Sequence, residues 1–333
     1  MVNYINFRYI CFFQFLCSKI ESILRKIQRG VNLKKSVFYK IKRLKNEKNA
    51  LILSHFYQRS EVQDVADFVG DSLELARIAS EAQEEVIVFC GVDFMAQTAY
   101  ILSPSKTILL PKTEASCPLA NMISANELQS LKQLYPDAKV VSYVNTTAEV
   151  KALSDFCCTS SNAQRVVNSI SSNSRIIFVP DKNLGLYIKE KTGRDLVLWD
   201  GYCPIHNRLT VEEVESAKNR HPEALVLAHP ECRMDVLKLA DFVGSTSAMV
   251  NYVQDSISKE YIICTESGVI NRMKKICPQK KFYSVCSNFV CKNMKLTSLE
   301  DVLISLETME PKITISEEIR SKAFSPISRM MNI

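Results

Sequence analysis

The 333-residue sequence lacks a long hydrophobic run, which argues against a membrane protein. A transmembrane helix needs about 20 consecutive apolar residues, whereas the apolar stretch 9–17 (YICFFQFLC) is short and contains Gln14. A cleavable signal peptide is not recognisable either. We therefore expect a cytoplasmic protein without a membrane partner. The basic extension 1–30 has no assigned role; an organellar targeting segment, or a start codon upstream of the true one, is the alternative.

A charge excess of one sign is also missing from most of the chain. The net charge of +6 is concentrated in residues 1–48, which hold twelve Lys and Arg and only two acidic residues. The remaining residues contain 30 basic and 34 acidic side chains, without a recognised nucleic-acid-binding motif. We therefore expect no nucleic-acid partner. The composition, 47% hydrophobic and 23% charged, is typical of soluble globular enzymes.

Twelve cysteines are present, but no two of them form a CxxC pair, and their spacings do not resemble a small disulfide framework. In a reducing compartment such cysteines are free, catalytic or bound to a metal. The adjacent pair Cys157 and Cys158 could belong to a dithiol oxidoreductase, but a bridge between neighbouring cysteines departs from ordinary disulfide geometry. We expect the pair to be packing residues.

An internal repeat organises the chain. Three segments align without gaps: 65–72 (VADFVGDS), 153–160 (LSDFCCTS) and 239–246 (LADFVGST). Twelve residues before the aspartate of each segment, an apolar run reaches its end, at His55, Tyr143 and His229. Two further apolar runs follow in each unit, and the last run of each leads to a cysteine: Cys117, Cys203 and Cys291, which are 86 and 88 residues apart. The Cys157–Cys158 pair aligns with Val–Gly pairs of the other two units, which favours packing.

Short apolar runs that alternate with helical patterns, such as 72–82 and 163–170, are typical of βα units in a parallel sheet. Runs that are apolar at consecutive positions fit strands covered by helices on both faces. We therefore predict an α/β fold of three-layer αβα domains with short parallel sheets, related by a pseudo-threefold axis. The expected domains are 31–117, 118–203 and 204–291, then a C-terminal helical segment, 292–333. A basic amphipathic helix over 33–46 should lead into the first strand.

The repeat places one cysteine at the carboxyl ends of the strands in each domain, where ligands bind in such sheets. Around a threefold axis Cys117, Cys203 and Cys291 would converge. Three thiolates suit a zinc ion with an open position, or a [4Fe–4S] cluster with one iron free of protein sulfur. An open iron is a Lewis acid that assists dehydration.

Hydroxyl residues recur near these cysteines, each before a segment with a helical pattern. They are Ser72, Thr159, Ser160, Ser245 and Thr246. Helix N-termini bind anions through backbone N–H groups, and neighbouring hydroxyls add donors. The three occurrences predict a pocket for phosphate and carboxylate groups.

Several longer segments resemble the quinolinate synthase family, from about residue 31 to about residue 325. Among them are SHFYQ, DFVGDSLELAR, YVNTTAEVKALSDFCCTSSNA, GYCPIHN, AHPEC and DFVGSTSAM. The resemblance implies three similar α/β domains with one [4Fe–4S] cluster at their junction, held by Cys117, Cys203 and Cys291. It also implies a role in de novo NAD biosynthesis, in which iminoaspartate and dihydroxyacetone phosphate condense to quinolinate, phosphate and water. An aspartate oxidase or dehydrogenase would supply the iminoaspartate.

The same resemblance assigns roles to residues of the predicted pocket. The expected substrate contacts are His55, Ser72, Tyr143, Val144, Asn145, Ser160, His229, Pro230, Glu231 and Thr246. The expected proton-handling residues are His55, Tyr57, Tyr143 and Glu231. Phe56 departs from the family, in which Asn is common at this position, and we expect little effect on the chemistry.

Two other functions stay open from the residues alone. Another cluster-dependent hydro-lyase would share the Lewis-acid step and differ in its substrate. A non-catalytic iron–sulfur sensor or phosphate-binding module would need the three cysteines but would tolerate replacement of His55, Tyr57 and Glu231.

Overall fold

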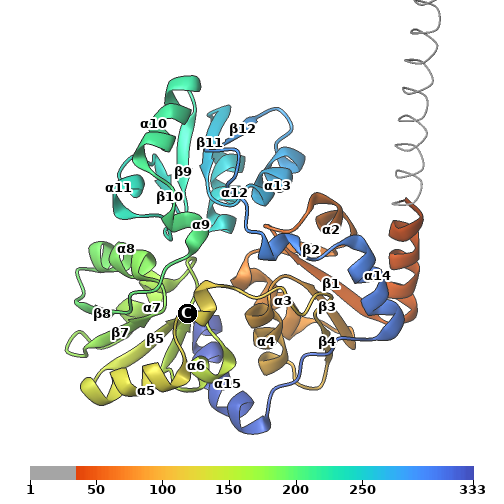
Figure 1. Ribbon diagram of the computed structural model, residues 1–333, viewed down its shortest axis with the longest axis horizontal. Coiled ribbons are helices and arrows are strands. Elements are labelled where there is room, and N and C mark those ends of the chain that lie inside the picture. Colours follow the sequence, from red (N-terminus) through yellow and green to blue (C-terminus); the bar gives the residue numbers. More distant parts are fainter. Residues whose placement is uncertain (1–34) are drawn as a thin grey trace, which may run out of the picture.

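The computed structural model describes residues 35–333, in which three α/β lobes surround a common centre (Figure 1). Each lobe holds a four-stranded parallel sheet, and all three sheets share one strand order, β2-β1-β3-β4 in the first lobe and its equivalents in the others. This is the α/β fold with three short parallel sheets that the repeat predicts. The extension 1–30 lies outside the described residues.

The strands of the three sheets occupy equivalent places in the repeat. The first sheet consists of β1 (Ala50–His55), β2 (Phe68–Gly70), β3 (Val86–Cys90) and β4 (Thr107–Leu109). The second consists of β5 (Lys139–Tyr143), β6 (Phe156–Cys158), β7 (Ile176–Val179) and β8 (Leu196–Leu198). The third consists of β9 (Leu225–Ala228), β10 (Phe242–Val243), β11 (Glu260–Cys264) and β12 (Lys281–Ser284).

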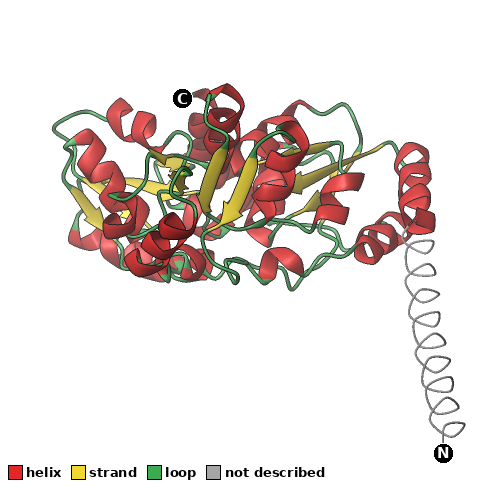
Figure 2. Ribbon diagram, turned by 90° about the horizontal axis from the view of Figure 1, so that it is seen from above, coloured by secondary structure: helices red, strands yellow, loops and turns green. Residues whose placement is uncertain are grey.

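Helices lie on both sides of the strands (Figure 2). The first lobe contains α2 (Ser60–Val65), α3 (Ser72–Glu81) and α4 (Asp93–Leu102). The second contains η1 (Leu119–Asn121), α5 (Ala125–Leu134), α6 (Ala148–Ala152), α7 (Ala163–Ser169) and α8 (Lys182–Thr192). The third contains α9 (Pro204–Asn207), α10 (Val211–Arg220), α11 (Met234–Leu237), α12 (Thr246–Asp255) and α13 (Gly268–Ile276). Because the sheets are covered on both faces, every residue of β1, β3 and β7 is buried.

Residues 35–47 form the predicted helix before the first strand. The helices predicted over 72–82 and 163–170 are α3 and α7. The C-terminal segment adds η2 (Asn293–Lys295), α14 (Leu299–Thr308) and α15 (Glu317–Asn332). Helix α15 packs against α4 of the first lobe and against α6 and β6 of the second, so the end of the chain joins two lobes. The limits of the individual domains stay a proposal.

The repeated DFVG-like segment forms the edge strand of each sheet, β2, β6 and β10. The aspartate before this strand makes two hydrogen bonds to one residue of the neighbouring central strand. Its carboxylate accepts from the backbone N–H of that residue, and its own backbone N–H donates to the carbonyl of that residue. The pairs are Asp67 with Ile52, Asp155 with Val140, and Asp241 with Val226. The strongest feature of the repeat therefore fastens the edge strand to its sheet.

Cys157 and Cys158 lie in β6, opposite Ser142 and Tyr143 of β5, and both side chains are fully buried. Burial raises the pKa of Cys157 to about 12. Both thiols are free, without a disulfide. The prediction that this pair is packing is confirmed.

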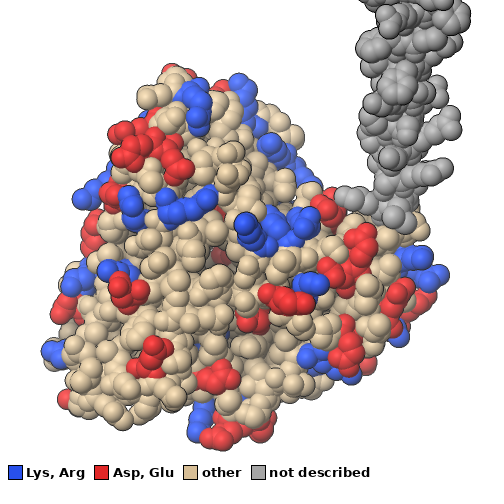
Figure 3. All heavy atoms as spheres, in the orientation of Figure 1, with Lys and Arg blue, Asp and Glu red and all other residues tan. Residues whose placement is uncertain are grey.

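The described surface carries both signs of charge. On the face drawn in Figure 3, Lys and Arg side chains are interspersed with Asp and Glu. Within residues 35–333, no helix is both long enough and apolar enough to cross a membrane.

Candidate active site

One small cavity collects predicted residues from all three lobes. We name it the central pocket; its volume is about 50 Å³. Ten predicted residues line it: His55, Tyr57, Ser72, Tyr143, Asn145, Thr159, Ser160, His229, Glu231 and Thr246. Its other described lining residues are Asp71, Phe94 and Met294. Their roles toward a substrate stay a prediction, but the side chains are brought together.

The repeat explains this convergence, because three positions of each unit reach the central pocket. The first position, at the end of a central strand, holds His55, Tyr143 and His229. The second, two residues later, holds Tyr57, Asn145 and Glu231. The third, after the edge strand, holds Ser72, Ser160 and Thr246. Since the carboxyl ends of parallel strands meet at one edge of a sheet, equivalent positions from three sheets face one another.

Two of the hydroxyls lie at helix N-termini fixed by capping. Ser72 is the first residue of α3, whose N-cap Asp71 accepts hydrogen bonds from two backbone N–H groups of the first turn. Thr246 is the first residue of α12, whose N-cap Ser245 accepts from the Ala248 N–H. The positive ends of both helix dipoles are thus directed at the central pocket, an arrangement that favours anions.

His55 is a neutral hydrogen-bonding group. Its Nδ1 accepts the backbone N–H of Tyr57 at 3.2 Å, so the ring proton is on Nε2. Burial lowers the pKa of His55 to about 4, and this effect outweighs the opposing pull of Asp71. His55 can therefore donate to an oxygen in the central pocket at neutral pH without carrying charge.

The two tyrosines of the central pocket are protonated phenols. Burial, and next the charge of Glu231, raise the pKa of Tyr57 and of Tyr143 well above the usual range. Tyr57 is also held by its ring, which meets the His55 ring edge-on with centroids 4.5 Å apart.

Glu231 is an ionised carboxylate of the central pocket. Burial alone would raise its pKa, but His229 and His206 outweigh burial and hold the pKa well below the usual range. The carboxylate Oε2 is 2.7 Å from Nδ1 of His206 and 3.4 Å from Nδ1 of His229. Since a carboxylate only accepts, His206 carries its proton on Nδ1.

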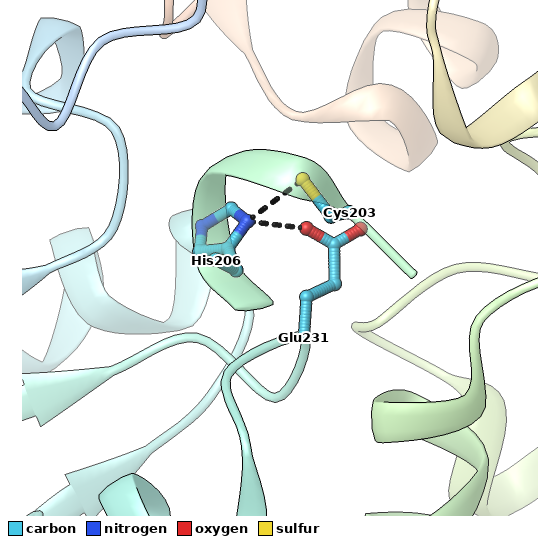
Figure 4. Close-up of side chains that lie close together, drawn as sticks. All are labelled: Cys203, His206 and Glu231. Carbon is cyan, nitrogen blue, oxygen red and sulfur yellow. Dashed lines mark hydrogen bonds and ion pairs between the residues drawn. The ribbon is translucent and has the colours of Figure 1, made fainter. Parts of the chain in front are cut away.

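His206 links Glu231 to Cys203 (Figure 4). Its Nδ1 is 3.2 Å from the Cys203 Sγ, and ligand atoms of all three residues lie within 4.8 Å of one another. Cysteine, histidine and glutamate could together hold a metal ion such as zinc. However, two ligand atoms on one tetrahedral zinc are about 3.3 Å apart, and the 2.7 Å contact between Glu231 and His206 is a hydrogen bond.

The other ring nitrogen of His206 is connected to Tyr57 through the hydroxyl of Thr265. Nε2 is 2.8 Å from the Thr265 Oγ1, which is 2.7 Å from the Tyr57 hydroxyl. The Tyr57 hydroxyl is also 3.0 Å from Oγ1 of Thr246. Burial lowers the pKa of His206, although Glu231 opposes the effect.

The three predicted metal ligands line a second, larger cavity of about 660 Å³, to which Cys117, Cys203 and Cys291 all contribute. Burial raises the pKa of each thiol, that of Cys117 to about 12. A cavity with three soft sulfur donors, one from each lobe, fits an iron–sulfur cluster or a zinc ion. Because thiolate is the ligand form, metal binding there must release protons.

A carboxylate holds the backbone of each of these cysteines. Asp93 is hydrogen-bonded to the backbone of Cys117. Asp181 accepts the N–H of Cys203 at 3.1 Å, and Glu266 accepts that of Cys291 at 3.3 Å. The carboxylates follow β3, β7 and β11 in turn, so this support also repeats in each lobe.

An outer pocket of about 490 Å³ adjoins the central pocket and shares Asp71 and Ser160 with it. Pro230 lines this outer pocket and not the central one. Val144 is buried, with 1% of its surface exposed, and is not among the described lining residues of either pocket.

Hydrogen bonds between lobes close the boundary between the two pockets. The three contacts are Ser161 to Asp71 at 2.9 Å, Ser247 to Glu74 at 2.5 Å, and His229 to Ser160 at 3.2 Å. Each pair of lobes is thus joined by at least one hydrogen bond beside the central pocket.

Sequence reasoning missed several residues of this centre. His206 has a local signal, the Cys203-x-x-His206 spacing. Asp181 and Glu266 have a signal in the repeat, because an acidic residue (Asp93, Asp181 or Glu266) follows the second apolar run of each unit. Thr265 has none, because its contacts join segments that are far apart in the chain.

Three α/β lobes with parallel sheets surround a pocket lined by hydroxyls and histidines, and a cavity lined by three thiols also lies between them. These features define a class of α/β protein with a candidate metal centre. The comparisons give its family. The family model described as quinolinate synthetase A protein matches residues 39–332. The chain belongs to the quinolinate synthase family.

Curated relatives cover most of the chain. The quinolinate synthase of Desulforudis audaxviator is 55% identical over 291 residues, which are 87% of this chain and 96% of the relative. That of Methanoregula boonei is 53% identical over 291 residues, with the same shares of the two chains. That of Caldicellulosiruptor bescii is 49% identical over 305 residues, 91% of this chain and 99% of the relative.

Proposed function

We propose that this chain is a quinolinate-forming enzyme of NAD biosynthesis that condenses iminoaspartate with dihydroxyacetone phosphate. The observation that carries the proposal is the central pocket itself. Nine residues expected from the family resemblance line one cavity at the meeting point of three lobes. An aspartate oxidase or dehydrogenase would supply the iminoaspartate.

The central pocket suits substrates with several anionic groups. Ser72 and Thr246 lie at the N-termini of α3 and α12, and Ser160 and His55 add neutral donors. Hydroxyls, ring N–H groups and helix dipoles can hold a phosphate and two carboxylates without lysine or arginine. The enamine carbon of iminoaspartate then displaces phosphate, and amine and carbonyl close the ring.

The proton transfers of this reaction are assigned to side chains of the central pocket. Glu231, as a carboxylate, is the base of the central pocket, whereas the protonated hydroxyls of Tyr57 and Tyr143 are donors. His55, neutral at physiological pH, donates through Nε2. These assignments follow from the pKa shifts: that of Glu231 is lowered, so it is ionised, whereas those of the two phenols are raised, so they are not.

We propose that Cys117, Cys203 and Cys291 hold a [4Fe–4S] cluster. When bound, the cluster supplies a Lewis-acidic iron for loss of water. The support is the shared cavity with one thiol from each lobe. His206 and Glu231 connect this cavity to the central pocket.

One experiment tests both parts. The full chain is purified without oxygen, its iron and visible absorption are measured, and quinolinate is assayed from fresh iminoaspartate and dihydroxyacetone phosphate. Cys203→Ser should lose the cluster and the activity. Cys286→Ser changes a free cysteine outside the described lining of either cavity and should keep both.

A cluster that persists in Cys203→Ser would contradict the ligand assignment. A cluster without quinolinate formation would favour another hydro-lyase or a sensor. These two alternatives separate on Glu231→Gln, which a sensor tolerates and a hydro-lyase does not.

A further inference from the structure

The cavity that contains the three predicted metal ligands differs in charge from the central and outer pockets. We name it the thiol cavity. The only charged side chains among its described lining residues are those of Arg208 and Lys292. The central and outer pockets, by contrast, both include the carboxylate of Asp71 in their described lining. The thiol cavity therefore has a positive lining without an opposing carboxylate.

Arg208 and Lys292 lie on the solvent side of the thiol cavity. Both are exposed, whereas Cys117, Cys203 and Cys291 are only partly exposed. Helix α9 begins after Cys203 and ends before Arg208, and Lys292 directly follows Cys291. A species that approaches the thiols from solvent on this side therefore passes both cations.

Neither cation makes an ion pair with a described residue. The Arg208 guanidinium donates to the backbone carbonyl of Asn288 and lies over the ring of Phe289, 5.7 Å from its centroid. These contacts hold the guanidinium in place but leave its charge uncompensated. Since ions screen charges only beyond about 8 Å at physiological salt, both side chains are able to attract an anion to the mouth of the cavity.

The proposed cluster is an anion when it arrives ready-made. A [4Fe–4S] cluster with a thiolate on each iron is a dianion. Burial raises the pKa of Cys117 to about 12, so the cysteine enters the exchange as a thiol. Three cysteines replace three of the thiolates, and each cysteine gives its proton to the thiolate that leaves as a thiol. The oxidation state of the iron and the charge of the cluster do not change.

We propose that Arg208 and Lys292 form an entry site for anionic, thiolate-ligated iron–sulfur clusters, through which the thiol cavity is loaded. This rests on the proposed [4Fe–4S] cluster. The two cations attract the dianion to the mouth of the cavity, where Cys117, Cys203 and Cys291 take it over. Attraction between opposite charges raises association rates by about 10- to 1,000-fold. The entry site thus acts on the rate of loading and not on the cluster finally held.

Loading is measured by visible absorption on the full chain, purified without its cluster. The probe is a [4Fe–4S] cluster that carries 2-mercaptoethanol thiolates. In the double variant Arg208→Gln with Lys292→Gln, the second-order rate constant should fall about tenfold at low salt, since both attracting charges are lost. At about 0.5 M salt the two proteins should differ by less than about twofold, because salt screens the attraction. The final iron content should equal that of the wild type.

Matched controls separate the entry site from net charge and from damage to the fold. Lys48→Gln with Lys218→Gln removes the same charge at exposed positions outside the described lining of the thiol cavity and should load at the wild-type rate. Arg208→Lys with Lys292→Arg keeps both charges and should load within about twofold of the wild type. Melting temperature identifies a double variant that does not fold, which the two single substitutions then replace.

A second source of the cluster tests whether the charge of the incoming species matters. Assembly from ferrous iron and sulfide begins with a cation, which Arg208 and Lys292 do not attract. The double glutamine variant should therefore assemble its cluster from these ions no more slowly than the wild type.

Four results would overturn the inference: wild-type loading in the double glutamine variant, an equal loss in the Lys48 and Lys218 control, an undiminished difference at high salt, or equally slowed assembly from ferrous iron and sulfide. A wild-type chain that takes up no cluster from either source would instead contradict the proposed cluster. The two failures are therefore distinguishable.

Discussion

Asn145 places a buried side-chain oxygen at the wall of the central pocket. Its Oδ1 has no hydrogen-bond partner among the described residues. A buried polar atom without a partner costs about 1–3 kcal/mol. Such a cost at a pocket wall is expected where a ligand supplies the missing bond.

Replacement of Asn145 by Leu should separate stability from binding. Asn145→Leu removes the unpaired oxygen at similar size, so the free energy of unfolding should stay equal or rise, while KM increases about tenfold. Chemical denaturation and steady-state kinetics measure the two effects. As a control, Ser305→Ala removes another unpaired buried oxygen, in α14, away from the central pocket, and should leave KM unchanged. A lower stability with unchanged KM in Asn145→Leu would contradict a binding role.

His55 should make the protein less stable in mild acid. Its pKa is about 4 in the folded chain against 6.5 unfolded, so between these values the unfolded chain binds more protons. The free energy of unfolding therefore falls as the pH drops from 6.5 to 4, by about 3 kcal/mol from this residue. In His55→Gln, denaturation curves at several pH values should show a shallower fall. The same slope in both proteins would mean that His55 is not buried in its neutral form.

The sequence predicted most of the site residues that repeat and missed those that do not. His55, Tyr143 and His229 end equivalent apolar runs, and their meeting follows from the geometry of parallel sheets. Thr265 and Phe94 carry no such mark, because their positions depend on how three lobes pack. The spacing of residues along the chain does not predict packing of this kind.

At the scale of elements, the repeated aspartates show how a short edge strand is kept in place. Strand β10 has only two residues, Phe242–Val243, and makes few ladder hydrogen bonds. The Asp241 carboxylate adds a bond to the Val226 N–H at 2.8 Å. This side-chain hydrogen bond compensates for the few backbone hydrogen bonds that so short a strand can form.

Removal of that carboxylate should loosen the edge strand. Asp241→Ala should lower the free energy of unfolding by about 1 kcal/mol, since one side-chain hydrogen bond to the backbone is lost at a solvated site. Asp241→Asn keeps an acceptor oxygen and should lose less. Chemical denaturation measures the difference, and an equal loss in both variants would assign the effect to charge rather than to the hydrogen bond.

Three strands of each sheet were predictable from their apolar runs, whereas the fourth was not. Segments such as 68–70 are too short for a clear alternation of apolar and polar residues. Their sequences are typical of a loop before a helix, although the repeat shows that the three segments are equivalent. Their strand character comes from pairing with β1, β5 and β9, which is a tertiary effect.

At the scale of the molecule, the central pocket is closed by contacts between lobes. A cavity of about 50 Å³ is far smaller than usual ligand sites, which measure about 300–1,000 Å³. We therefore expect the lobes to separate when substrate enters. The outer pocket shares Asp71 and Ser160 with the central one, so we expect entry from that side.

Weakening one contact between lobes should shift this equilibrium toward the open form. Ser247→Ala removes the hydrogen bond to Glu74, worth about 1 kcal/mol. KM should then rise about fivefold while kcat changes little. Ser258→Ala, a change outside the contacts between lobes, serves as control. A KM equal to that of the wild type would mean that this contact does not limit closure.

The threefold repeat has a consequence for what one pocket can contain. In a ring of three identical subunits, any side chain at the axis appears three times, and a substitution changes all three copies together. A single continuous chain is free of that constraint. Tyr57, Asn145 and Glu231 occupy one equivalent position, yet they are a phenol, an amide and a carboxylate. An asymmetric substrate pair can thus meet an asymmetric set of groups inside a scaffold that is itself symmetric.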